Sequence, residues 1–96
     1  MLYALFFSCI VSVTGELSCA VNYTNMDDVA TTKAHCLARA REMQRNAIAS
    51  ALYDKKDMKP ALQDVYCGTR EEMIVKGADK HNVLRNAGIE TDFFEF

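Results

Sequence analysis

Histidine and cysteine are the side chains of this sequence best suited to chemistry, and they meet at one place. His35 and Cys36 are neighbours, and His81 is the only other histidine. Adjacent side chains on a helix diverge by about 100°, so this thiol and imidazole cannot act on one atom. The histidines are also too few for a zinc site, and no phosphate-binding loop or nucleophile motif is present. The sequence predicts no catalytic residue, no cofactor and no metal site, and hence no enzyme.

The N-terminal segment is typical of a secretory signal peptide. Residues 2–13 form an apolar run that breaks at Gly15. The run is shorter than the roughly 20 apolar residues of a membrane span, which favours a signal peptide over an anchor. Small residues allow cleavage after Gly15 or after Ala20.

Cysteine parity favours the later cleavage site. Cleavage after Ala20 removes Cys9 and Cys19 and leaves Cys36 and Cys67 as an even pair. Cleavage after Gly15 leaves an odd thiol in an oxidising compartment. We therefore expect a signal peptide at 1–20, a single small domain at 21–96, and a disulfide between Cys36 and Cys67.

The long stretch from Thr31 to Tyr53 has the clearest periodicity of the chain. Apolar residues recur on one face at the spacing of a core-facing helix. Asn25 is a plausible N-cap, which places the expected helix start near Met26. The apolar stripe consists of Cys36, Ala40, Met43, Ala47 and Ala51.

Shorter helices are expected in the second half. Pro60 suits the first turn of a second helix that runs to Cys67. Thr69 and Glu72 form a capping box that opens a third helix, which Gly77 ends or interrupts. The sequence shows no β pattern. It therefore predicts an all-α fold, a small bundle of about three to four helices with one long N-terminal helix, stapled by one disulfide.

The disulfide restricts how these helices connect. Cys36 lies about 26 Å from the end of the first helix, and the expected second helix returns only about 12 Å. Bridged Cα atoms lie within about 7 Å of each other, so a tight helical hairpin cannot form this bond. An extended connector over residues 54–59 spans up to about 20 Å and resolves the mismatch.

Surface features suggest modification and binding. Asn22 begins an N-glycosylation sequon. Lys55 and Lys56 form a dibasic pair, for which a solvated turn is favoured over a processing site. The acidic tail carries aromatic residues that either fold back onto the helices or dock a partner, namely Phe93, Phe94 and Phe96.

The formal net charge of −2 favours neither nucleic acid nor a membrane surface as a partner. The sequence favours a secreted effector that binds an extracellular protein, such as a hormone-like, salivary, venom or reproductive secretion. The alternative is a helical carrier of a small apolar ligand, of the odorant-binding or secretoglobin type. The gap from Cys36 to Cys67 is loosely like one in odorant-binding proteins, but their further cysteines are absent. No membership of that family is inferred.

Overall fold

A four-stranded sheet between two helices forms the fold. The computed structural model describes residues 1–89 and 91–95, with only the backbone of residues 92–95. The elements in chain order are β1 (Tyr3–Ser12), β2 (Leu17–Asn25), α1 (Lys33–Ala51), β3 (Met58–Gly68), α2 (Arg70–Asn86) and β4 (Thr91–Glu95).

The hairpin of β1 and β2 lies at the centre of the sheet, whose strand order is β3-β1-β2-β4. β1 is antiparallel to both β2 and β3, and the short β4 is parallel to β2. Gly15 forms part of the hairpin turn, where its φ of 86° is a conformation that glycine adopts without strain. β3 and β4 are therefore the two edges.

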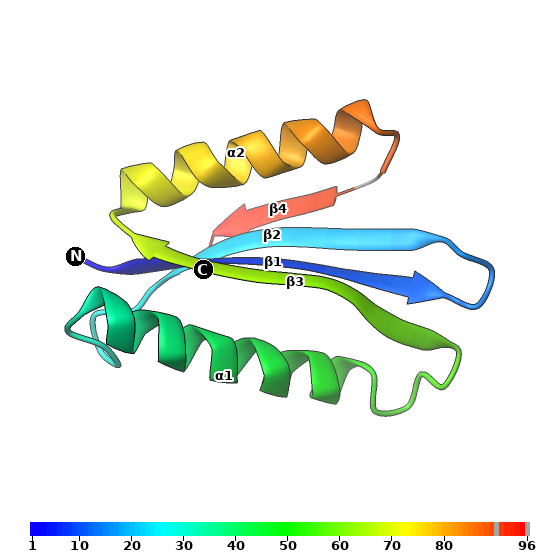
Figure 1. Ribbon diagram of the computed structural model, residues 1–96, viewed down its shortest axis with the longest axis horizontal. Coiled ribbons are helices and arrows are strands. Elements are labelled where there is room, and N and C mark those ends of the chain that lie inside the picture. The colour runs from blue at the N-terminus through cyan, green and yellow to red at the C-terminus, as the bar shows by residue number, and fades with distance from the viewer. Residues whose placement is uncertain (90, 96) are drawn as a thin grey trace.

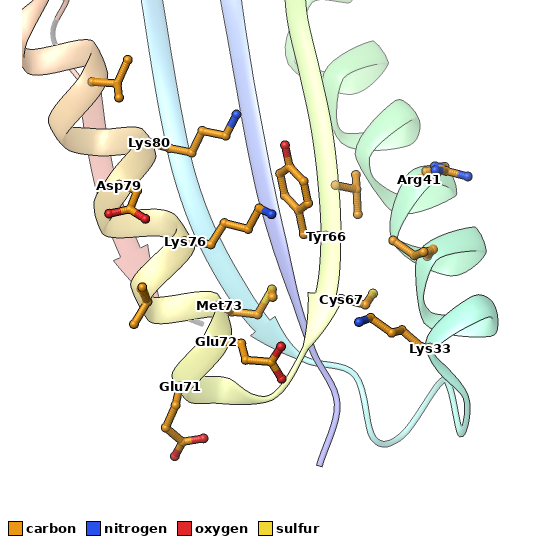
Figure 2. Close-up of a pocket in the computed structure, with 14 residues that line it drawn as sticks. Lys33, Arg41, Tyr66, Cys67, Glu71, Glu72, Met73, Lys76, Asp79 and Lys80 are labelled. Atoms are coloured by element: carbon orange, nitrogen blue, oxygen red, sulfur yellow. The ribbon is translucent and has the colours of Figure 1, made fainter.

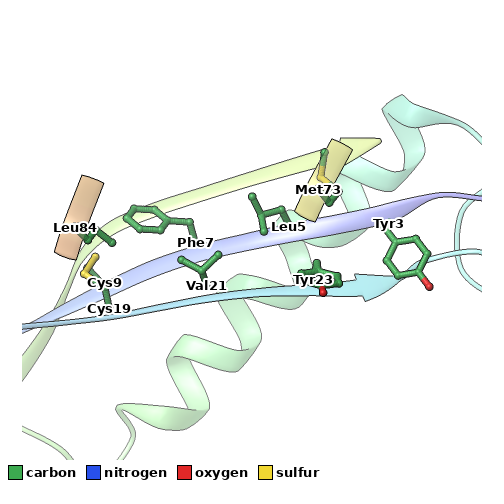
Figure 3. Packing of buried hydrophobic residues seen from close by; sticks show 9 residues of the cluster. All are labelled: Tyr3, Leu5, Phe7, Cys9, Cys19, Val21, Tyr23, Met73 and Leu84. Atoms are coloured by element: carbon green, nitrogen blue, oxygen red, sulfur yellow. A yellow bond between two sulfur atoms is a disulfide. The ribbon is translucent and has the colours of Figure 1, made fainter. Parts of the chain in front are cut away.

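The helices cover opposite faces of the sheet, which gives three layers (Figure 1). Alternate residues of β1 face opposite ways, as in any strand. Leu5 and Phe7 pack with Met73 and Leu84 of α2 (Figure 3). Ala4 and Phe6 belong to a second cluster that contains Cys36 and Ala40 of α1.

The prediction of an all-α helical bundle is wrong. Residues 3–12 form a strand buried on both faces over much of its length. A strand buried in this way is a continuous apolar run without alternation, so its sequence resembles a signal peptide core. The expected helix from Pro60 to Cys67 is also strand, within β3.

The two observed helices were both predicted, with different ends. α1 is capped by Thr32, whose side chain accepts from the backbone N–H of His35, rather than by Asn25. α2 has the predicted capping box, and it continues through Gly77 as one helix.

The N-terminal segment has a structural role in this fold. Residues 1–20, the expected signal peptide, contain β1 and the first part of β2. A chain cleaved after Ala20 would lack the central strand, so cleavage there and this sheet exclude each other. Cleavage itself stays a prediction.

Candidate functional site

The free edge of β3 lies in a groove between the two helices (Figure 2). The groove has a volume of about 980 Å³ and is open to solvent. We call it the β3 groove. α1 contributes Lys33, Leu37 and Arg41, β3 contributes Val65, Tyr66 and Cys67, and α2 contributes Glu71, Glu72, Met73, Val75, Lys76, Asp79, Lys80 and Val83.

The α1 wall is held to the sheet by a covalent bond and by a buried amide. A disulfide joins Cys36 to Cys67, with the two Cα atoms 6.3 Å apart. Further along α1, the Nε2 of Gln44 donates to the backbone oxygens of Phe7 at 3.0 Å and Asp64 at 3.2 Å. These contacts fix α1 against β1 and β3.

The α2 wall starts directly after β3. Gly68 ends the strand, and a Cβ at this position would lie 3.1 Å from the Cε of Met73. Glycine therefore leaves room for the side-chain ends of Met73 and Glu72 against the strand. The Thr69 backbone N–H donates to Oε1 of Glu72 at 3.1 Å, and this bond, with the Thr69 side chain, holds the pKa of Glu72 below its ordinary value of 4.5.

Two lysines of α2 reach over aromatic rings of β1 and β3, and Figure 2 shows both lysines beside Tyr66. The Nζ of Lys76 lies 4.1 Å from the centroid of the Tyr66 ring. The Nζ of Lys80 lies 5.2 Å from the Phe7 ring and 5.6 Å from the Tyr66 ring. Lys80 is also 3.9 Å from a carboxylate oxygen of Asp64. Cation–π contacts of this kind hold the ammonium groups near the groove.

The β3 groove lies away from most of the residues that the sequence singled out. Cys67 lines it, whereas Asn22 lies half-buried in β2, where it pairs with Phe6. His35 is exposed on α1, and Cys36 is buried in its disulfide.

The aromatic tail is described only in part. The backbones of Phe93 and Phe94 lie in β4, in register with Val21 and Asn22 of β2. Their side chains, and all of Phe96, lie outside the described residues. The prediction that this tail binds a partner stays a prediction.

A second disulfide, which the sequence reasoning missed, joins Cys9 to Cys19 across the hairpin. The two residues face each other in the β1–β2 register, with their Cα atoms 4.0 Å apart. The signal was present in the sequence, since Gly15 lies between these cysteines. The signal-peptide interpretation removed both cysteines from consideration.

Within the described residues, no three histidine, cysteine or acidic side chains are grouped to bind a metal ion. In the same part of the chain, no helix has the length and hydropathy needed to cross a membrane. No family model matches the chain, and the searches of curated proteins and of solved structures likewise found no match.

Proposed function

We propose that this protein is a secreted, non-enzymatic effector that binds an extended segment of another protein along β3. The observation that supports this proposal is the free edge of β3 between α1 and α2. An edge strand presents unpaired backbone N–H and C=O groups to which another strand can add. Backbone hydrogen bonds would supply affinity, and the helices would contact alternate side chains.

The shape of the groove favours one added strand over a second sheet. Helices that flank the edge leave room for a single extended segment, whereas a second copy would bring helices of its own.

The first half of β3 is also poorly suited to pairing, because it contains the exposed Lys59 and Pro60. The β1–β3 register shifts between Cys9 and Ile10, opposite this half. Lysine, proline and bulges are the usual protections of an edge strand.

Export is supported by the cysteines. Two disulfides in a small domain are compatible with a secreted protein, because such bonds persist in oxidising compartments. The Cys36–Cys67 bond also fixes α1, one wall of the groove, to β3, and a rigid binding surface lowers the entropy cost of association.

The carrier alternative has less support. A carrier of small apolar ligands encloses most of the ligand surface. The β3 groove is open and has charged groups on both walls, and the apolar side chains of Leu5 and Val21 are already buried in a packed cluster.

Amide hydrogen exchange, measured by NMR, tests strand addition directly. The probes are short end-blocked peptides of high β propensity in acidic, neutral and basic versions. We expect the best-binding peptide to slow exchange at alternate amides of β3 between Asp64 and Cys67. The same peptide N-methylated at alternate positions is the control, because it cannot complete the backbone ladder. Unchanged exchange along β3 with every peptide would refute the proposal.

A further inference from the structure

We infer that the segment bound in the β3 groove is acidic, with carboxylates on both faces of the added strand. This inference rests on the proposed function and specifies the chemistry of the partner.

The α2 wall directs two cations toward Tyr66 of β3, on the side of the ring that faces β1. The ammonium groups of Lys76 and Lys80 lie within cation–π distance of Tyr66 (Figure 2). Lys80 forms an ion pair with Asp64, and both side chains are partly exposed. An exposed ion pair contributes little, so a ligand carboxylate can share or replace this partner.

The α1 wall contributes basic side chains to the lining of the groove and no acidic ones. Its groove-lining residues are Lys33, Leu37 and Arg41. Arg41 also lines the adjoining hollow beside Asp64, together with Arg45. The basic side chains on this wall therefore extend along the strand.

The groove carboxylates of α2 are placed differently. Glu72 lies at the β3–α2 junction, where it is engaged by Thr69. In Figure 2, Glu71 points away from Tyr66 at the start of the helix, and Asp79 lies along the helix rather than over the ring. Positive charge therefore predominates next to the strand edge. Apart from Asp64 on the strand itself, negative charge lies at the end of the strand and on the outer side of α2.

The geometry of a β-strand converts this arrangement into a sequence preference. Successive side chains of a strand point to opposite faces. A strand added to β3 would direct alternate side chains toward α1 and toward α2. Carboxylates at two consecutive positions would then meet Arg41, or Lys33 in competition with Glu72, on one side and Lys76 or Lys80 on the other. Complementary charges of this kind select the partner and accelerate its association.

A matched set of fluorescent peptides tests this inference. The probe is an end-blocked peptide that repeats Glu-Glu-Thr-Val, and the controls carry glutamine or lysine at every glutamate position. We expect the glutamate peptide to bind at least about tenfold more tightly than the glutamine peptide at low salt, with the difference reduced by added salt. The double variant Lys76→Gln/Lys80→Gln should lose most of this difference. The matched control Lys55→Gln/Lys56→Gln, in the turn before β3, should retain it.

The outcomes separate the inference from the function on which it rests. Circular dichroism and thermal unfolding first establish that both double variants are folded. If the glutamine or lysine peptide binds as well as the glutamate peptide and slows exchange along β3, the acidic preference is refuted and strand addition stands. Equal loss of binding in both double variants also refutes the preference, because it shows attraction by net charge alone. If no peptide slows exchange along β3, strand addition itself is refuted.

Discussion

Gln44 shows how one residue sets the spacing between α1 and the sheet. Its side chain is only 7% exposed, and its Nε2 donates to backbone oxygens of both β1 and β3. Gln44→Ala removes this donor from two carbonyl groups. We therefore expect a loss of about 1–3 kcal/mol in the free energy of unfolding, measured by urea denaturation. Gln63→Ala is the control, because Gln63 is exposed, and it should change stability by less than about 0.5 kcal/mol. Equal effects of the two substitutions would contradict this role.

Glu72 contributes a pH dependence at the start of α2. The backbone N–H of Thr69, then its side chain and, to a smaller extent, Lys33 lower the pKa of Glu72 below 4.5. A carboxyl group whose pKa is lower in the folded state stabilises the fold at pH values above its unfolded pKa. This stabilisation disappears as the pH falls through the lower, folded value.

Glu72→Gln should therefore reduce the dependence of stability on acid. Glutamine retains the acceptor oxygen but does not titrate, so the variant should lose less stability than the wild type between pH 7 and about pH 3. Glu71→Gln is the control, since Glu71 is the accepting group in neither bond of the capping box. Chemical denaturation at a series of pH values measures the difference. If plots of unfolding free energy against pH are parallel for Glu72→Gln and the wild type, the capping contact does not alter the titration of Glu72.

At the scale of elements, the two disulfides should stabilise unequally. The Cys36–Cys67 bond closes a loop with a sequence separation of 31 and joins α1 to β3, whereas Cys9–Cys19 has a separation of 10 within a hairpin. On the chain-entropy model, the long loop is worth about 4 kcal/mol and the short loop about 3 kcal/mol. Replacing Cys36 and Cys67 by alanine should therefore lower the thermal midpoint more than replacing Cys9 and Cys19. A larger decrease in the thermal midpoint on replacing Cys9 and Cys19 would indicate that the hairpin depends on its disulfide.

The helices were predictable because their signals are local. The spacing of apolar residues between Thr31 and Tyr53 gives the period of a helix, and the Thr69–Glu72 capping box marks the start of α2. The strands were not predictable in this way. β1 is buried on both faces and lacks alternation, and Pro60 fits an edge strand as well as a helix start.

The geometry of the cysteines nevertheless pointed toward β3. The distance from the end of α1 back to Cys36 required an extended segment, and an extended chain rises about 3.3 Å per residue. β3 covers this distance as one extended strand from Met58 to Cys67, without a separate helix. The β3 groove itself was beyond sequence reasoning, because its walls come from elements whose positions depend on strand order. Its local signal was the pair Lys76 and Lys80, one helical turn apart.

At the scale of the whole molecule, the fold depends on the residues expected to be removed. β1 lies between β2 and β3 and supplies the fully buried Ala4 and Leu5, one to each core cluster. A chain of residues 21–96 would therefore leave β3 without a neighbouring strand. We expect this truncated chain to show no cooperative thermal transition by circular dichroism, whereas the full chain of residues 1–96 should show one.

Removal of an edge strand provides the matched comparison for that truncation. Deleting residues 91–96 takes away β4, the edge strand that pairs with β2, so this variant should remain folded with a lower thermal midpoint. The intact mass of protein recovered outside cells then determines which form exists in nature. Material that retains residues 1–20 is expected if the groove is to bind a partner. Recovered material that begins at Val21 and unfolds cooperatively would show that the active protein has a different fold, and the β3 groove would have no functional role.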